Sequence, residues 1–303
     1  MKKFIFKPAA AAEKIDALFQ GSFPGLYDLM LRARMLREDR ASRLLIADQI
    51  SRITGTDPLP GFSSIEIETI NRCNSTCSFC PVNSRDDRRP YAVMDDALAT
   101  SLLEQLGEMK YSGALALYSN NEPLLDKRIT TLHQKARKMV PEASIHLYTN
   151  GTLLSPELFN ELIPHLDELV IDNYDDSLRI LPTVEALIPL IEASPELLEK
   201  VRIYVRRKNA VRRTRGGEAK NRRHIHSRLT SSCVLPFSQM VIRPDGKVSL
   251  CCQDALGKMT LGDCSKDDLM TIWHGEPFRD IRRKILKGRS AIRMCSQCDH
   301  FGY

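Results

Sequence analysis

The sequence has no long apolar run: no segment approaches the roughly 18 consecutive apolar residues that a membrane-spanning helix needs. The start of the chain does not predict a secretory signal either, because the short apolar stretch after Lys2 and Lys3 is interrupted at Lys7 and again at Glu13. The whole sequence contains 43% hydrophobic and 27% charged residues, as an ordinary globular protein does. We therefore expect a cytoplasmic protein that does not contact membranes.

Disulfide bonds are not expected, since they are rare in the reducing cytosol, yet the chain contains nine cysteines. No cysteine lies between Cys80 and Cys233, so the nine fall into two local groups. The first group is Cys73, Cys77 and Cys80. The second lies in the last quarter of the chain and consists of Cys233, Cys251, Cys252, Cys264, Cys295 and Cys298. Two separate groups of this kind predict two metal sites.

Acidic residues are almost absent from one stretch of the chain. Residues 200–228 hold twelve Lys/Arg residues and one acid, Glu218, whereas the net charge of the whole chain is only +6. The basic character belongs to one segment, so nucleic acid is not an expected partner. The segment is either a solvated charged loop or a substrate-binding loop. In the second case Arg206, Arg213 and Arg215 would grip carboxylate, phosphate or hydroxyl groups.

Strand-like and helix-like segments alternate after residue 60. The strands are expected at residues 64–70, 114–118, 144–148, 169–172 and 201–205. The helices are expected at residues 95–109, 127–139, from 155 with an interruption at Pro164, and at 184–198. This alternation predicts parallel strands in an α/β layer or barrel. Ligands of such folds bind at the C-terminal strand ends, where the first cysteine loop, residues 119–123 and Thr149-Asn150 fall.

The last part of the chain has a different pattern. Residues 240–250 predict a β-hairpin that turns at Pro244-Asp245-Gly246. One helix is expected at residues 267–286. We therefore divide the chain into a helical extension at residues 1–60, an α/β domain at residues 61–230 and a small C-terminal domain at residues 231–303.

The first cysteine group has the spacing C-x3-C-x2-C and directly follows a predicted strand. A tight loop with these spacings can turn the thiolates of Cys73, Cys77 and Cys80 toward one [4Fe–4S] cluster. Three thiolates leave one iron without a protein ligand, and an open coordination site is where a substrate or cofactor binds. Zinc is the alternative, but it usually requires a fourth Cys or His, and the nearby sequence offers none.

This loop, placed after the first strand of a βα repeat, resembles the signature of the radical S-adenosylmethionine (SAM) superfamily. The resemblance implies that the amino and carboxylate groups of SAM chelate the open iron. It also implies that a flavodoxin- or ferredoxin-type donor reduces the cluster, and that SAM then releases a 5′-deoxyadenosyl radical that abstracts a hydrogen atom. The implied fold is a partial (β/α)6 barrel, similar to a TIM barrel.

The resemblance extends to residues that bind SAM in this family. Phe79, directly before the third cysteine, corresponds to an aromatic residue that lies by the adenine. The family's Gly-Gly-Glu-Pro segment holds the SAM amino group, and both of its glycines are replaced here. The corresponding residues are Asn120, Asn121, Glu122 and Pro123. Thr149 and Asn150 occupy the position of polar contacts to the SAM ribose.

Four cysteines of the second group flank the predicted hairpin and end in a C-x2-C pair. They are Cys233, Cys251, Cys295 and Cys298. The stretch resembles the twitch version of the SPASM domain, the short module that carries an auxiliary [4Fe–4S] cluster in radical SAM enzymes. Four cysteines suffice to ligate such a cluster fully, which implies electron transfer rather than substrate coordination. A structural zinc ribbon with the same ligands is the alternative.

Cys252 and Cys264 are left without a metal to bind. Cys252 follows a predicted ligand and faces the opposite side of its strand. There it could donate a hydrogen atom to a substrate radical, as thiols do in radical SAM epimerases, or it could simply pack. For Cys264 we expect burial as a small apolar residue.

The expected reaction is the two-electron oxidation of an alcohol in a small polar substrate that resembles a sugar or an aminocyclitol. The auxiliary cluster would accept the second electron. Epimerisation with Cys252 as the hydrogen donor is the first alternative, and radical modification of a peptide is the second. An alternative from another class is a zinc-binding protein that holds nucleic acid with residues 200–228, but it leaves the three-cysteine loop unexplained.

Overall fold

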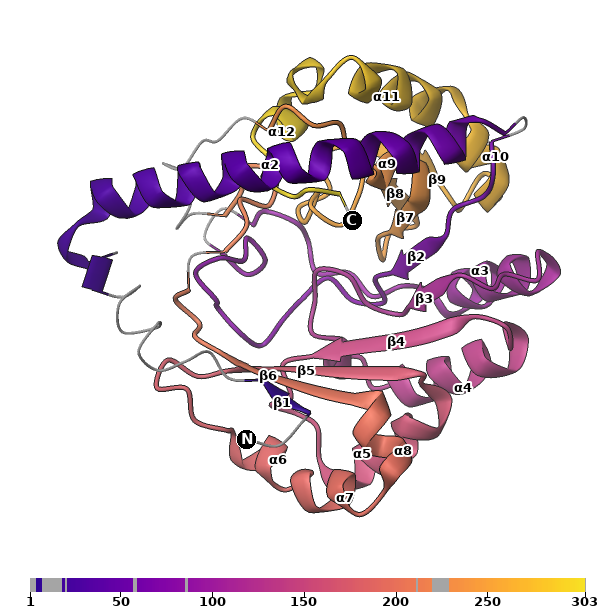
Figure 1. The fold of residues 1–303 in the computed structure, drawn as a ribbon. Coiled ribbons are helices and arrows are strands. Elements are labelled where there is room, and N and C mark those ends of the chain that lie inside the picture. Colours follow the sequence, from indigo (N-terminus) through magenta and orange to yellow (C-terminus); the bar gives the residue numbers. More distant parts are fainter. Residues whose placement is uncertain are drawn as a thin grey trace.

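The computed structural model describes residues 4–6, 18–19, 21–56, 59–84, 87–210, 212–219 and 229–302. Within them, the strands form one nine-stranded sheet in the order β1-β6-β5-β4-β3-β2-β7-β8-β9 (Figure 1). Neighbours from β1 to β7 in this order are parallel, and β8 and β9 continue the sheet in antiparallel pairs. The bounds are β1 Ile5–Phe6, β2 Ser64–Ile67, β3 Ala114–Ala116, β4 Ser144–Thr149, β5 Glu168–Tyr174, β6 Val201–Arg206, β7 Gln239–Ile242, β8 Lys247–Ser249 and β9 Thr260–Asp263.

Strands β2 to β6 alternate with helices, which confirms the predicted α/β pattern. The first of these helices are α3 Asp96–Glu108, α4 Ile129–Met139 and α5 Pro156–Leu162. Helix α3 shows why such a segment forms a helix at this place. The Asp95 side chain accepts a hydrogen bond from the Ala97 N–H at 2.8 Å and so caps its N-terminus. Leu102, Leu103 and Leu106 are fully buried on the face toward the sheet.

Prolines divide two segments that we predicted as single helices. Residues 184–198 fall into α6 Pro182–Glu185, α7 Ile188–Glu192 and α8 Pro195–Lys200. Residues 267–286 fall into α10 Leu269–His274 and α11 Glu276–Leu286. The single-helix predictions are wrong because Pro189, Pro195 and Pro277 each stand in the first turn of a new helix, where the missing N–H needs no partner.

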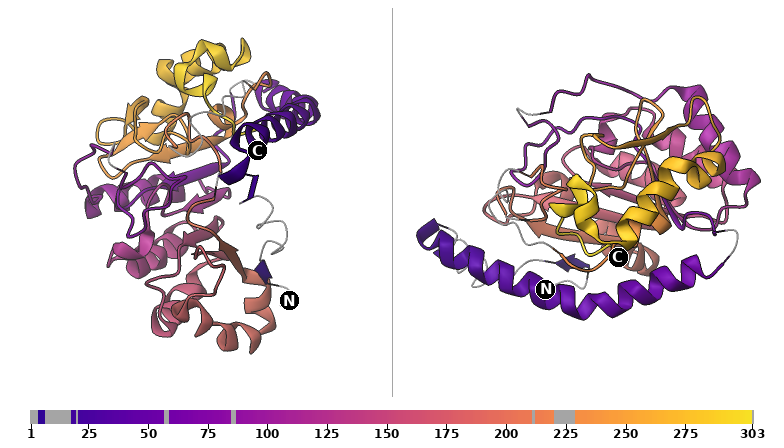
Figure 2. Two further views of the ribbon diagram at one scale, coloured as in Figure 1. Left: turned by 90° about the vertical axis from the view of Figure 1, so that its left-hand side faces the viewer. Right: turned by 90° about the horizontal axis from the view of Figure 1, so that it is seen from above.

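The described residues of the N-terminal part include a long helix, α2, and a short strand, β1. Helix α2, Pro24–Thr54, begins with a proline in its first turn and ends at Gly55. It lies alongside the C-terminal domain in Figure 1 and along one side of the molecule in the right-hand view of Figure 2. We did not predict strand β1. It pairs with β6 and forms the edge of the sheet at the end away from β9. No helix of the described residues is long and apolar enough to cross a membrane.

The predicted hairpin forms, but it is not separate from the α/β sheet. Strands β7 and β8 are antiparallel around Gly246, whose φ of +77° suits a glycine in the turn. Strand β7 also pairs with β2 in parallel, from Ser64 opposite Gln239 to Ile67 opposite Ile242. The first strand of the hairpin therefore extends the parallel part of the sheet.

Candidate active site

The C-terminal ends of the parallel strands surround a cavity of about 160 Å³, the inner cavity. All three cysteines of the first group line it, and so do all the predicted SAM-binding residues. These are Phe79, Asn120, Asn121, Glu122, Thr149 and Asn150. The loops after β2, β3 and β4 supply them, as expected for a site at the C-terminal edge of a parallel sheet.

Burial dominates the chemistry of the cysteine loop. It raises the pKa of Cys73 to about 12. The charges of Glu122, Cys80 and Cys77 contribute to this raised pKa, so these groups lie close together. Among the described residues, no group of three His, Cys, Asp or Glu side chains is arranged to hold a single metal ion. In a cluster, each thiolate binds a separate iron, and the irons supply the positive charge that buried thiolates need. The donor set fits a [4Fe–4S] cluster.

Glu122 is a buried carboxylate at the wall of the inner cavity, with 2% of its surface exposed. It accepts hydrogen bonds from the Thr149 hydroxyl at 2.6 Å and from the Asn150 N–H at 2.8 Å. Burial raises the pKa of Glu122, and these donors oppose the rise. The carboxylate thus ties the end of β4 to the cavity and can bind an ammonium group.

The two asparagines that replace the family's glycines have different contacts. Asn121 closes a turn, because its Oδ1 accepts a hydrogen bond from the Ser119 N–H at 2.9 Å. Its Nδ2 is buried without a hydrogen-bond partner among the described residues, and so leaves a donor for a ligand. Asn120 reaches the C-terminal domain, where its Nδ2 donates to the Cys252 carbonyl at 3.0 Å.

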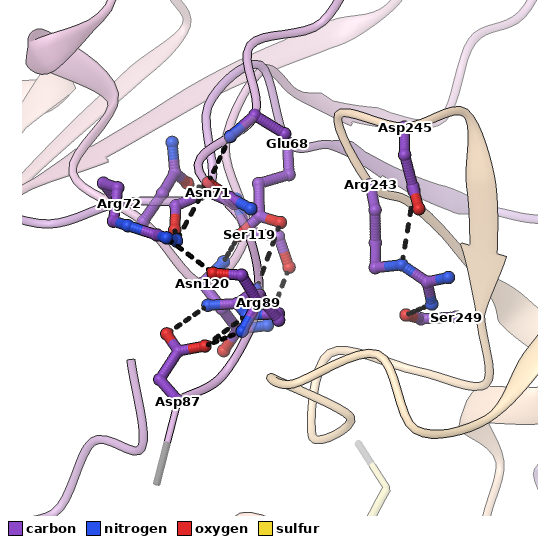
Figure 3. Close-up of polar contacts among 12 residues, drawn as sticks. Glu68, Asn71, Arg72, Asp87, Arg89, Ser119, Asn120, Arg243, Asp245 and Ser249 are labelled. Atoms are coloured by element: carbon purple, nitrogen blue, oxygen red, sulfur yellow. Dashed lines mark hydrogen bonds and ion pairs between the residues drawn. The ribbon is translucent and has the colours of Figure 1, made fainter. Parts of the chain in front are cut away.

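Two polar groups lie beside each other here, one after β2 and β3 that includes Glu68 and Asn120, and one in the hairpin that includes Arg243 (Figure 3). Burial raises the pKa of Glu68 to about 7, and its Oε1 accepts a hydrogen bond from the Asn120 N–H at 3.2 Å. Arg89 Nη1 lies 3.9 Å from Glu68 Oε2. From the hairpin, Arg243 donates to the Ser249 hydroxyl at 2.8 Å. Glu68, Arg89 and Arg243 line a cavity of about 450 Å³ between these two parts of the chain. Glu68, directly after β2, therefore holds the Asn120 backbone from the side of the sheet.

A larger cavity of about 550 Å³, the outer cavity, lies next to the inner one. Five residues line both, namely Phe79, Tyr148, Asp172, Tyr174 and Arg215. The two cavities therefore adjoin each other. A molecule in the outer cavity would lie against the residues that surround the cysteine loop.

The three arginines predicted to bind substrate differ in position. Arg213 and Arg215 line the outer cavity. Arg206 is not among the described residues that line either cavity. Its Nη1 lies instead 2.9 Å from Asp172 Oδ1. Arg206 therefore has an indirect place in the site, as the ion-pair partner of Asp172.

The four remaining cysteines predicted as ligands meet beside the hairpin. Cys233, Cys251, Cys295 and Cys298 have exposed fractions between 6% and 8%. Burial raises the pKa of Cys251 well above its usual range, and the charges of Cys252, Cys233 and Cys298 raise it further. Four buried thiols that lie together fit a fully ligated cluster, whose irons supply the positive charge that their thiolates need.

The backbone and one arginine are shaped around these thiols. Gly302 has a φ of +90°, and a Cβ at this position would lie 2.9 Å from Cys233 Sγ. The His300 N–H donates to Cys298 Sγ at 3.4 Å. Arg289 is 3% exposed, donates to the Ser231 carbonyl at 2.9 Å and lowers the pKa of Cys298 against the effect of burial. N–H groups and positive charge around the sulfurs are features that tune iron–sulfur clusters.

Comparisons with known proteins agree with this geometry. Residues 67–173 match the model of the radical SAM superfamily, and residues 233–299 match the SPASM model of an iron–sulfur cluster-binding domain. This chain is a radical SAM enzyme. Its cofactors are SAM, a [4Fe–4S] cluster and an auxiliary cluster. The matches do not favour the alternative of a zinc-binding nucleic-acid protein.

A similar sequence and similar solved structures cover most of this radical SAM enzyme. A protein from Niallia circulans, described as an S-adenosyl-L-methionine-dependent 2-deoxy-scyllo-inosamine dehydrogenase, is 28% identical over 241 residues, which are 79% of this chain and 93% of that protein. The crystal structure of BtrN in complex with AdoMet and 2-DOIA has a TM-score of 0.70 at 27% identity, over 80% of this chain and 94% of that chain. Streptococcus suis SuiB bound to precursor peptide SuiA shares the fold alone, with a TM-score of 0.52 at 14% identity over 84% of this chain and 73% of that chain.

The two extra cysteines of this radical SAM enzyme lie outside both cavities. Cys252 is not among the described residues that line the inner or the outer cavity. Its N–H donates to Gln239 Oε1 at 3.0 Å, and its carbonyl accepts hydrogen bonds from Asn120 and Arg215. Cys264 is buried in the apolar core.

Our sequence analysis of this radical SAM enzyme missed several cavity residues. They are Tyr118, Tyr148, Asp172, Tyr174 and Arg212. The first four stand in or just after the C-terminal ends of β3, β4 and β5, so strand position was a usable signal. The Arg212 guanidinium lies 5.1 Å from the centre of the Phe79 ring. This contact joins two loops that are far apart in the chain, so no local sequence pattern predicts it.

Replacing Glu122 by Gln should weaken SAM binding about tenfold or more, because the substitution removes the charge that we predict to bind the SAM ammonium but keeps the shape. The dissociation constant can be measured by calorimetry on oxidised, cluster-loaded enzyme, in which SAM is not cleaved. The exposed Glu161→Gln is a matched control and should bind SAM as the wild type does. Wild-type affinity in Glu122→Gln would remove Glu122 from the amino-group site.

Proposed function

We propose that this enzyme oxidises a secondary alcohol in a small polar ring compound, an aminocyclitol or a sugar. The observation that carries the proposal is the outer cavity, which adjoins the predicted SAM-binding residues and is lined by both guanidinium and carboxylate groups. Arg213 and Arg215 suit hydroxyl groups, while Asp172 and Asp299 suit an ammonium group. By its name, the similar protein from Niallia circulans acts on such an aminocyclitol.

When bound, SAM and the two clusters would supply the radical that removes the carbon-bound hydrogen and the acceptor for the second electron. The chain itself must hold the alcohol and take up its hydroxyl proton. Among the described residues that line both cavities, Asp172 alone carries a carboxylate, so we assign the hydroxyl proton to it. Arg206 orients this carboxylate across 2.9 Å. The rings of Phe79 and Tyr174, with centres 5.4 Å apart, shield the same place from water.

The electron that starts each turnover must come from outside the chain. We propose a flavodoxin- or ferredoxin-type protein as its donor, because such proteins deliver single electrons at low potential. A chemical reductant can replace this partner in an assay, so the reaction can be tested before the partner is known.

Cluster-loaded enzyme, dithionite, SAM and 2-deoxy-scyllo-inosamine should give a ketone and 5′-deoxyadenosine in about equal amounts. Mass spectrometry measures both products. Release of S-adenosylhomocysteine alone would mean methyl transfer and would contradict the proposal. Cys252→Ala should still form the ketone, since the thiol lines neither cavity. Loss of turnover in this variant, with deuterium from deuterium oxide on the substrate carbon of the wild-type product, would point to epimerisation instead.

A further inference from the structure

One face of helix α2 forms a wall of the outer cavity. The lining residues from this helix are Tyr27, Leu31, Arg34, Met35 and Glu38. Their spacing of three or four residues places them on one side of the helix. None of them lines the inner cavity. Helix α2 therefore closes the outer cavity on a side that does not border the inner cavity.

A buried carboxylate holds α2 in this position. Asp39 is 1% exposed and follows the lining face directly. It accepts hydrogen bonds from the Thr230 hydroxyl at 2.6 Å and from the Ser231 N–H at 3.0 Å. Arg43, one turn later, donates to the same Thr230 hydroxyl at 2.6 Å. Thr230 and Ser231 shortly precede Cys233, so the helix packs on the segment that leads into the auxiliary-cluster cysteines.

Apolar packing supports the same docking. Met35 is 4% exposed and forms a buried cluster with Leu229 and Phe301. The opposite side of α2 faces solvent, with Leu44 81% exposed. The cavity face is thus held by contacts with residues 229–231 and Phe301, while the outer face contributes nothing to the site.

We propose that α2 is the outer wall of the substrate site and selects substrates by the groups that they carry away from the reacting carbon. The inference rests on the proposed function, because it assigns the outer cavity to the substrate. Helix α2 lies before both matched regions, residues 67–173 and 233–299, so it is a feature that the family matches do not describe.

The chemistry of the wall indicates what it would bind. Tyr27 offers a hydroxyl group, and Arg34 and Glu38 offer opposite charges that pair at 2.9 Å. Such a surface suits hydroxyl and ammonium substituents of a ring better than an apolar group. Arg213, which also lines the outer cavity, adds a further donor.

The test compares substitutions on the two sides of α2, with 2-deoxy-scyllo-inosamine as the probe. Tyr27→Ala and Glu38→Ala should each raise KM about fivefold or more, with a smaller effect on kcat, because they remove contacts made equally before and during the reaction. Leu44→Ala, on the exposed side, should leave both constants unchanged. Wild-type KM values in both cavity-facing variants would overturn the inference.

A second measurement needs no substrate and separates this inference from the proposed function. If wild-type enzyme does not oxidise the probe, the substrate class is wrong, and the wall is tested by phenylglyoxal labelling of Arg215 in cluster-loaded protein. Asp39→Asn weakens the docking of α2 and should speed this labelling about threefold or more, whereas Leu44→Ala should not. Peptide mass spectrometry gives the rates, and iron content confirms that each variant is folded. Equal rates in Asp39→Asn and wild type would show that α2 does not cover the cavity.

Discussion

Cys77→Ala should release no 5′-deoxyadenosine from SAM, and its iron content after anaerobic reconstitution should fall from about eight to about four atoms per chain. The cysteine loop must hold three corners of the cluster so that the fourth iron stays open for SAM. With Cys77 removed, the two remaining thiols of the loop, Cys73 and Cys80, cannot hold the cluster in this way. Chromatography of the SAM products and an iron assay measure the two effects.

Cys264→Ala is the matched control for this result. Its thiol is also buried, but it belongs to the apolar core and lines neither cavity among the described residues. It should therefore keep about eight irons and full SAM cleavage. If the wild-type protein instead saturates at about four irons, it holds no auxiliary cluster.

Cys298→Ala should leave hydrogen abstraction intact but prevent the formation of the ketone. The inner cavity is untouched, so SAM is still cleaved and hydrogen is still abstracted, but the second electron has lost its acceptor. With substrate deuterated at the reacting carbon, the label should appear in 5′-deoxyadenosine while the ketone falls to background. Mass spectrometry of both compounds in one sample gives the answer.

The outcome that contradicts this scheme is ketone formation at the wild-type rate by Cys298→Ala protein that holds about four irons. In that case the second electron leaves by another route. Electron paramagnetic resonance of the reduced variant checks that the remaining signal belongs to the first cluster and changes when SAM is added.

Much of the site could be predicted because its signals are local in sequence. The first cysteine group, Cys73, Cys77 and Cys80, lies within eight residues. Its loop follows a strand that β-branched residues predict. Helix starts were readable where a side chain caps them, as Asp95 and Ser155 do. Residues at strand ends then converge simply because the strands are parallel.

The rest depends on contacts between distant segments. The arginine-rich stretch was recognisable, but the pairing of Arg206 with Asp172 was not, because it joins neighbouring strands that are far apart in the chain. Strand β1 has two residues, too few to show any alternation. Helix α2 was expected as a helix, but its apolar residues face both the core and solvent, as Ile46 and Leu44 show, so its cavity face could not be identified.

The pairing of β2 with β7 has a consequence for how this protein folds. Strand β2 lies between β3 and β7, so a fragment that stops before residue 231 would leave β2 as an open edge. Its Ile65 and Ile67 are 1% exposed, and an apolar edge strand with unpaired N–H and C=O groups invites association with other chains. The segment that carries the auxiliary-cluster cysteines therefore also completes the sheet beneath the first cluster. We therefore expect the two cluster sites to unfold as one cooperative unit, with a separation set by hydrogen-bonded strands rather than by a hinge.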